Sequence, residues 1–203
     1  MIRFKTKLLL CSLYFIFILS YTGIVIHAQE RHDISIQYGL VTTPEIFDAL
    51  APEITTDAEA SIYEKTNKQW LGGFYVNYKY FYIPSMSVGL TFGYDRVWCN
   101  LEYGREKQGE CSRDFYTISA EWTVHYIRKD YFQMYSGGGL AATFVYEDYS
   151  VYDGNQEISS KSKVYPNFNF TFTGLRFGPQ CAFFLETGFG YKGIICGGIS
   201  TQF

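Results

Sequence analysis

Long apolar runs are almost missing from this sequence. After residue 26, no stretch reaches the ~18 consecutive apolar residues that a membrane-spanning helix requires. Any membrane span in this part of the chain would therefore consist of β-strands, because a closed barrel of strands also satisfies every backbone polar group in lipid. Helical spans are excluded there.

Concentrated positive charge is also missing. The chain has 17 Lys and Arg against 20 Asp and Glu, a net charge of −3, and its basic residues form no run. Proteins that bind nucleic acids carry a basic patch or stripe on one face. We therefore expect no nucleic acid among the partners.

Histidine and cysteine are too scarce to suggest a metal or cofactor site. The chain has 3 His and 5 Cys, with no CxxC motif and no cluster of both residue types. Ser119, Glu121 and His125 share one face of a predicted strand and superficially resemble a catalytic set. At ~3.3 Å per residue, however, Ser119 and His125 would lie about 20 Å apart, so they cannot exchange a proton. We assign no catalytic residue, no metal and no cofactor.

The N-terminal segment has the layout of a secretory signal. Arg3, Lys5 and Lys7 precede an apolar run at residues 8–26. Small Ala28 follows this run, which predicts a signal peptide of residues 1–28 and one domain of residues 29–203. The run is nearly long enough to span a bilayer, so an uncleaved anchor helix is the alternative.

Aromatic residues are abundant, at 20% of the chain, and they favour sheet over helix. From His32 onward, apolar residues alternate with small or polar ones in eight stretches, which is the period of a strand with two unlike faces. The clearest apolar face is Tyr116, Ile118, Ala120, Trp122, Val124 and Tyr126. The other seven contain Ile34, Ile36, Tyr38 and Leu40; Trp70, Phe74, Val76, Tyr78 and Tyr80; Val88, Leu90, Phe92 and Tyr94; Phe132, Met134, Leu140, Phe144 and Tyr146; Phe168, Phe170 and Phe172; Phe183, Leu185, Phe189 and Tyr191; and Ile195, Ile199 and Phe203.

The size of the aromatic face indicates which way it points. A soluble barrel would bury these rings inside, but an eight-stranded barrel has an interior only wide enough for modest side chains. Lipid accepts any amount of aromatic surface, while a narrow lumen accepts Gly, Ser, Thr and a few charges. The sequence therefore predicts an all-β fold, an eight-stranded antiparallel up-and-down transmembrane β-barrel.

The predicted connections alternate in length. Tight turns are expected at residues 81–85, 128–130 and 177–180, and long polar loops at 42–68, 103–113 and 149–163. At the end of the barrel with the long loops, only the last connection, near residues 191–193, is short. Short turns at one end and long loops at the other are typical of outer-membrane barrels.

Four ionisable residues point to the predicted lumen. They are Lys79, Glu121, Glu186 and His125, with Asp95 and Arg176 nearer the strand ends. Because buried charges need partners, we expect a polar network that closes the lumen. A gated, very narrow pore is the alternative.

Two disulfides can be drawn between the cysteines that follow the signal. Cys99 and Cys111 flank the second long loop, and Cys181 and Cys196 lie on the last two strands. The second pair depends on strand register, because a shift of one residue would place its members on opposite faces.

Taken together, the signal, the eight alternating segments and the order of turns and loops resemble the small outer-membrane β-barrel family related to OmpX and the OmpA membrane domain. In that family a C-terminal aromatic residue, preceded by alternating apolar residues, is read by the barrel-assembly machinery. The resemblance implies that Ile195, Ile199 and Phe203 form this signal. It also implies a place in the bacterial outer membrane, with outer-membrane lipid and the assembly machinery as partners.

Function is less readable, because a fold alone transfers no activity. Sparse chemical groups and long polar loops favour a non-enzymatic integral outer-membrane protein. Its outward-facing loops would serve surface display, adhesion or envelope interaction and would contact an extracellular ligand.

One alternative is a secreted soluble lipocalin-like barrel that binds an apolar ligand among inward-facing aromatics. Another is a membrane-embedded lipid-modifying enzyme, which needs a Ser or His with a carboxylate partner at the outer rim.

Overall fold

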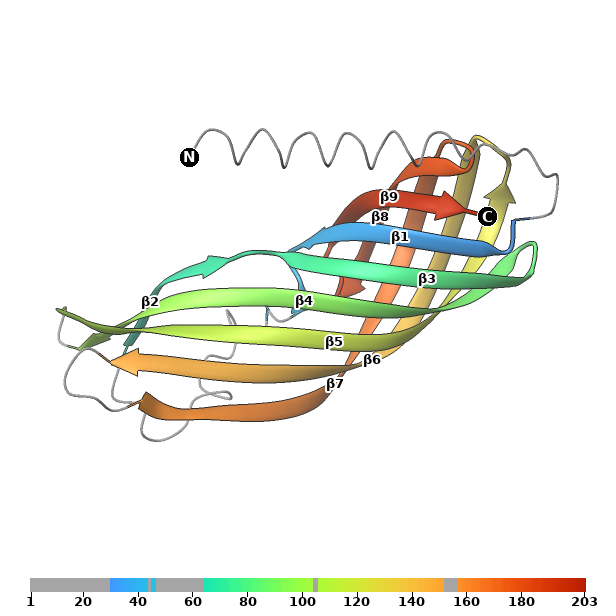
Figure 1. Cartoon of the computed structure of the whole chain (residues 1–203). Coiled ribbons are helices and arrows are strands. Elements are labelled where there is room, and N and C mark those ends of the chain that lie inside the picture. Colours follow the sequence, from blue (N-terminus) through green and yellow to red (C-terminus); the bar gives the residue numbers. More distant parts are fainter. Residues whose placement is uncertain (1–29, 44, 47–63, 104–105, 152–156) are drawn as a thin grey trace, which may run out of the picture.

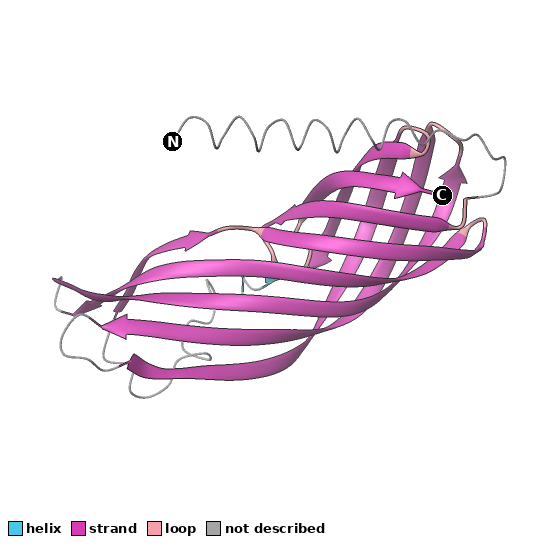
Figure 2. Ribbon diagram, in the orientation of Figure 1, coloured by secondary structure: helices cyan, strands magenta, loops and turns pink. Residues whose placement is uncertain are grey.

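The computed structural model describes residues 30–43, 45–46, 64–103, 106–151 and 157–203. Nearly all of this part of the chain is strand (Figure 2). The strands are β1 (His32–Leu40), β2 (Glu64–Trp70), β3 (Gly73–Ile83), β4 (Met86–Tyr103), β5 (Glu106–Arg128), β6 (Phe132–Val151), β7 (Glu157–Phe177), β8 (Cys181–Gly190) and β9 (Ile195–Gln202). No helix among these residues is long and apolar enough to cross a membrane. The predicted signal peptide of residues 1–28 lies outside them and stays a prediction.

Eight of the strands close into an antiparallel barrel. β1 pairs with β3 on one side and with β9 on the other, and β4 pairs with β5, so the ring has no gap. This confirms the predicted fold. The remaining strand, β2, pairs with the distal part of β4 and lies outside the ring. Trp70, expected in the second barrel strand, ends β2 instead.

The barrel strands differ widely in length. β1, β8 and β9 have 9, 10 and 8 residues, close to the ~9–11 that a membrane strand needs. β4, β5, β6 and β7 have 18, 23, 20 and 21 residues. These four strands continue past the barrel rim and, together with β2, form a sheet that projects from one end (Figure 1). We call this sheet the extension; it comprises β2 and residues 95–103, 106–115, 145–151 and 157–163.

The extension corrects the prediction of three long loops. Residues 103–113 are almost entirely strand, because β4 ends at Tyr103 and β5 begins at Glu106. β6 and β7 likewise occupy most of 149–163, and β2 begins inside the loop expected at 42–68. The tight turns at the opposite end lie where they were predicted, between β3 and β4, β5 and β6, and β7 and β8.

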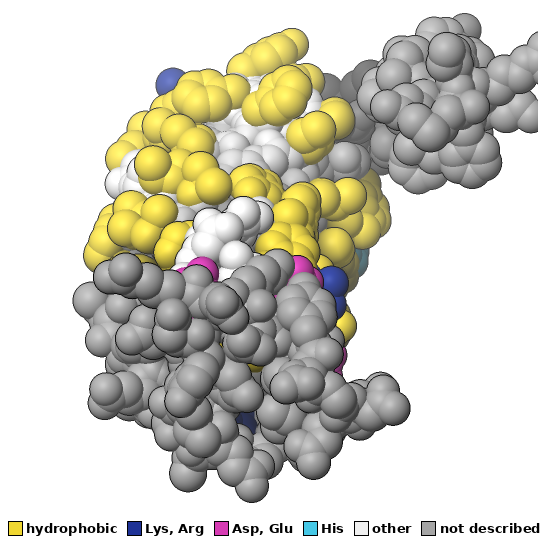
Figure 3. All heavy atoms as spheres, turned by 90° about the vertical axis from the view of Figure 1, so that its left-hand side faces the viewer, with side chains coloured by type: hydrophobic (Ala, Val, Ile, Leu, Met, Phe, Trp, Pro, Cys, Tyr) yellow, Lys and Arg dark blue, Asp and Glu magenta, His cyan; other side chains and the backbone are white. Residues whose placement is uncertain are grey.

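The barrel is apolar outside and polar inside. On the outer face Ile36, Phe170 and Phe172 are 64%, 52% and 67% exposed, whereas inward-facing Asn77 and Thr91 are fully buried. Hydrophobic side chains accordingly gather on the visible outer face of the barrel in Figure 3. This polarity excludes the lipocalin-like alternative, which requires the aromatics to face inward.

The apolar belt has the height of a bilayer core. On β5 it runs from Tyr116 to Tyr126, which is about 34 Å along the strand and about 25 Å across at a tilt of ~40°. At its upper edge, Tyr116 contacts Tyr94 and Tyr146 with ring centroids 5.2 and 5.7 Å away. Aromatic girdles of this kind mark the interfaces of outer-membrane barrels.

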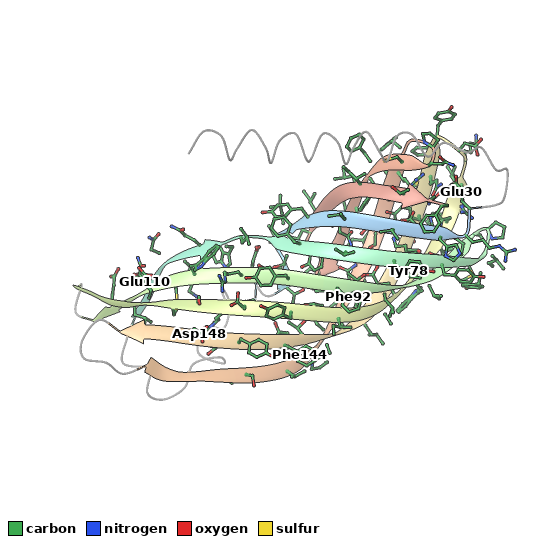
Figure 4. The ribbon with its side chains drawn as sticks, in the orientation of Figure 1. Glu30, Tyr78, Phe92, Glu110, Phe144 and Asp148 are labelled. Atoms are coloured by element: carbon green, nitrogen blue, oxygen red, sulfur yellow. A yellow bond between two sulfur atoms is a disulfide. The ribbon has the colours of Figure 1, made fainter. Side chains whose placement is uncertain are left out.

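Beyond Tyr94, Tyr116 and Tyr146, on the side of the extension, the two faces of the strands exchange polarity. In the extension most inward side chains are apolar and buried, as with Val97, Leu101 and Phe115. One buried ion pair lies among them, with Arg113 Nε 2.9 Å from Glu147 Oε1. Outward positions hold polar residues such as Glu110 and Asp148, both labelled in Figure 4. The β4–β5 register is continuous from Met86 to Leu101, so the exchange comes from the amino acids and not from a bulge.

Candidate functional site

A cluster of four charges fills the middle of the lumen. The predicted residues Lys79, Glu121 and Glu186 lie there together with Lys192. The Lys192 Nζ is 2.7 Å from Glu121 Oε2 and 3.5 Å from Glu186 Oε2, and Lys79 Nζ is 3.7 Å from Glu186 Oε1. Two positive and two negative charges therefore neutralise one another inside the barrel.

Hydrogen bonds complete the environment of these carboxylates. Tyr191 and Thr91 each donate a hydroxyl to Glu121 Oε1 at 2.5 Å, and Asn77 Nδ2 donates to Oε2 at 2.9 Å. Glu186 accepts from the Tyr135 hydroxyl at 2.8 Å. Buried ion pairs are tolerated when such bonds satisfy the remaining lone pairs, so the cluster acts as a packed plug.

Tyr191 and Lys192 reach this plug from the β8–β9 turn. The predicted lipid-facing position of Tyr191 is wrong: its side chain is fully buried, its hydroxyl donates to Glu121, and the Ser119 hydroxyl lies 2.6 Å from the same oxygen. The cause is backbone geometry, since positive φ angles at Gly190 and Gly193 (144° and 94°) fold the turn inward. The Gly-x-x-Gly spacing around a Tyr-Lys pair was the available signal, and it was missed.

His125 lies at the opposite, short-turn end of the lumen. Its ring packs between Phe81 and Tyr135, with centroids 5.1 and 4.9 Å away. The adjoining cavity, which Asp33 and Ser200 also line, measures about 10 Å³, room for about one water molecule. Within the described residues, His125 Nδ1 has no hydrogen-bond partner.

This geometry gives the lipid-modifying alternative no support. Ser200 Oγ accepts from Arg176 Nε at 2.8 Å, and Asp33 Oδ2 accepts from Gln202 Nε2 at 2.8 Å, so neither group is directed at the histidine. The cavity has no space for a lipid and is not at the outer rim. Among the residues that the structure describes, no cluster of His, Cys, Asp and Glu could hold a metal ion.

The two possible disulfides have different outcomes. Cys99 and Cys111 are directly opposed on β4 and β5, with Cα atoms 5.1 Å apart, and form a disulfide inside the extension. The second pair is wrong. Cys181 pairs in register with Thr201 and is exposed, whereas Cys196 pairs with Glu186 and is buried, so both thiols are free.

A second polar cluster lies where the barrel meets the extension. The Thr42 hydroxyl donates to Asp95 Oδ2 at 2.5 Å, and the Thr42 backbone N–H donates to Glu45 Oε2 at 3.0 Å. Burial, and then the nearby Asp95 charge, raise the pKa of Glu45. One threonine thus holds two carboxylates close together at the rim.

On the outward face, an ion pair lies just above the apolar belt. The Arg96 guanidinium contacts both oxygens of Asp114, at 2.5 and 2.6 Å, and the Tyr94 hydroxyl donates to the same carboxylate at 2.7 Å. Burial raises the pKa of Asp114, but the Arg96 and Tyr94 hydrogen bonds outweigh burial and lower it. Arg96 also lies 5.8 Å from the Trp98 ring.

The predicted assembly residues share the outward side of β9. Ile195, Ile199 and Phe203 are 48%, 50% and 57% exposed. The Phe203 N–H donates to the His32 carbonyl at 2.9 Å, and the two rings stack. Their role as an assembly signal stays a prediction.

Comparison with solved structures found a similar barrel. The crystal structure of Ail, the attachment invasion locus protein of Yersinia pestis, is 15% identical in sequence with a TM-score of 0.41; the comparison covers 85% of this chain and 95% of that one. Ail in complex with the heparin analogue sucrose octasulfate gives 15% identity, the same coverage and a TM-score of 0.42. No family model and no curated protein matches the sequence. The barrel assignment follows from the strand pairing itself.

Proposed function

We propose that this chain is a non-enzymatic integral protein of the bacterial outer membrane that presents the extension outside the cell as an interaction surface. The exchange of polarity between barrel and extension carries the proposal. An apolar belt about 25 Å high suits lipid, whereas the outward face of the extension, with Asn100, Glu110 and Ser112, suits water.

The direction of the extension follows from the ends of the barrel. The tight turns, Glu30 and Phe203 lie at one end, and the extension projects from the other (Figures 1 and 4). Outer-membrane barrels keep short turns in the periplasm and longer segments outside the cell. By this rule the extension faces the exterior.

A transport role has little support, because the lumen is plugged. Tyr191 and Lys192, from the β8–β9 turn, close the lumen on that side. The charges of Lys79, Glu121 and Glu186 are compensated within the cluster. An ion would have to displace a buried, hydrogen-bonded network. We therefore favour contact over conduction.

The contact surface is the broad outward face of the extension. Along β7, β8 pairing begins only at Asn169, and the Phe168 carbonyl accepts from the Tyr191 N–H, so residues 157–167 pair with no strand on that side within the described part of the chain. Pro166 and Lys163 lie on this edge, and both residue types discourage the addition of another strand. The other outer strand, β2, is interrupted by a register shift after Thr66. Both edges thus oppose strand pairing.

A shortened variant tests the proposal. Residues 97–113 and 147–161 would each be replaced by a two-residue turn, because Arg96 pairs with Asp114 and Tyr146 with Ser162. Cells that produce either protein would be fractionated, and unheated and boiled samples compared by gel electrophoresis. We expect both proteins in the outer membrane with a heat-dependent shift, and loss of cell attachment or autoaggregation only in the variant. A soluble full-length protein, or full attachment by the variant, contradicts the proposal.

A further inference from the structure

One hollow opens in the extension, where β2 meets β4. Its volume is about 350 Å³, within the ~300–1,000 Å³ range of small-molecule sites. The lining consists of Asn67, Gln69, Trp98, Asn100, Glu110 and the Cys99–Cys111 pair. Glu110 is labelled near the far end of the extension in Figure 4.

Local backbone geometry creates this hollow. The β2–β4 register shifts between Thr66 and Gln69, and Asn67 in the gap has a φ of 49°, in the left-handed region where asparagine is tolerated. This bulge separates β2 from β4 beside Trp98. The Cys99–Cys111 disulfide joins β4 to β5 at the same level, so the wall opposite the bulge is cross-linked.

The strand pleat directs the lining side chains to one face. Gln69 pairs with Trp98, and Asn100 pairs with Glu110. Trp98 and Asn100 are two residues apart on β4, so both pairs of side chains lie on the same face of the sheet. The Trp98 ring is 37% exposed. The Arg96 guanidinium, held by Asp114, lies 5.8 Å from the centre of that ring.

The chemistry of these groups matches an uncharged sugar. A tryptophan ring offers a flat apolar surface for the C–H face of a pyranose, and amides both donate and accept hydrogen bonds with hydroxyls. Asn67, Gln69 and Asn100 supply three such amides. Glu110 adds acceptor oxygens and is the one ionisable side chain in the lining, so its carboxylate would repel an anionic ligand.

We infer that this hollow binds a short neutral saccharide, with the ring stacked on Trp98 and its hydroxyls bound by the three amides and Glu110. The inference rests on the proposed function, because a saccharide outside the cell reaches the hollow only when the extension lies there. It names the ligand class for that interaction surface.

The test uses the full chain in lipid nanodiscs, titrated with N,N′-diacetylchitobiose, lactose and maltose, and with glucose 6-sulfate as the anionic comparison. Calorimetry would measure binding. We expect at least one neutral sugar to bind, with Trp98→Ala weakening it about tenfold through loss of the stacking surface. Trp122→Phe, a matched change on the lipid-facing belt, should leave affinity unchanged.

A second variant guards against misfolding of the first. Gln69→Ala combined with Asn100→Ala removes two amides and keeps Trp98, and it should also weaken binding while the heat-dependent gel shift persists. The inference is overturned by no binding of any neutral sugar, by equal affinity of Trp98→Ala, or by a preference for glucose 6-sulfate. Loss of surface exposure on intact cells, with saccharide binding retained in nanodiscs, would instead contradict the proposed function alone.

Discussion

The barrel and the extension share four strands but bury opposite faces. On β4, Leu90 and Phe92 point outward and apolar, whereas Val97 and Leu101 point inward and apolar, within one continuous register. The pleat fixes only that neighbouring side chains alternate. In the proposed placement, lipid surrounds the barrel and water surrounds the extension, and this difference in surroundings accounts for which face is hydrophobic in each.

The two regions are also stabilised differently. The barrel interior depends on a cluster of compensated charges such as Lys192–Glu121. The extension depends mainly on an apolar cluster around Val97 and Phe115 and on one disulfide, beside a single buried ion pair, Arg113–Glu147. Substitutions that affect one region should therefore leave the other largely intact.

The largest expected effect is at the plug. Lys192→Met should lower the free energy of unfolding by about 3–5 kcal/mol, because Glu121 and Glu186 lose their shared cation while remaining buried. Urea unfolding in lipid vesicles measures this. The exposed Lys163→Met change on the extension is the control and should stay within about 0.5 kcal/mol. If both variants lost the same free energy of unfolding, the stabilising role of the charge cluster in the lumen would be contradicted.

The double variant sharpens this test. Adding Glu121→Gln to Lys192→Met removes the uncompensated charge, so part of the lost stability should return. A loss equal to the sum of the two single variants would show that the pair does not interact.

A smaller effect is expected on the lipid face. Phe170→Lys should weaken barrel assembly by about 2–4 kcal/mol, because a charge would lie in mid-membrane lipid. Ser112→Lys, on the outward face of the extension, should have almost no effect. Unfolding in bilayers compares them, and an unaffected Phe170→Lys protein would reverse the proposed facing.

Removal of the disulfide should act on the extension alone. Replacing Cys99 and Cys111 with Ser opens a link across 12 residues, which is worth about 2–3 kcal/mol. Limited proteolysis should then cut the extension while the heat-dependent barrel shift persists. If the barrel shift were lost as well, the two regions would not be separable.

The smallest effect concerns pH at the rim. Burial and Asp95 raise the pKa of Glu45 in the folded protein, so folding favours its protonated form. That contribution is complete below the unfolded pKa and is lost as pH rises through the raised value. Glu45→Gln should remove this dependence, a change below ~1 kcal/mol for a partly exposed group. Unfolding at pH 4 and pH 7 should show a smaller difference in the variant; an unchanged difference contradicts the assignment.

The sequence predicted the barrel because apolar and polar residues alternate regularly and the apolar residues stay on one face, as from Tyr116 to Tyr126. Lys79, Glu121 and Glu186 were placed in the lumen by the same alternation. The same criterion predicts loops for the extension, because the hydrophobic positions change face near Asp95 and the one-sided alternation ends there. Residues 97–101 still alternate, with Val97, Cys99 and Leu101 on one face, and this was the signal to follow.

Other features depend on geometry that single residues do not encode. Lys192 enters the lumen only because Gly190 and Gly193 adopt positive φ angles. Cys181 and Cys196 fail to meet because β8 and β9 pair with Leu185 opposite Gly197, which places the two cysteines at different levels. Register and turn conformation follow from the assembled sheet.

Cysteine labelling on intact cells tests the central claim most directly. In a background with Cys181 and Cys196 replaced by Ser, one cysteine would be placed at Ser162 of the extension and another, in a separate protein, at exposed Ser85 of a tight turn. We predict that a membrane-impermeant maleimide labels the Ser162 position on intact cells and the Ser85 position only after the outer membrane is permeabilised. The reverse pattern, or equal labelling of both, would contradict an outer-membrane barrel with an outward-projecting extension.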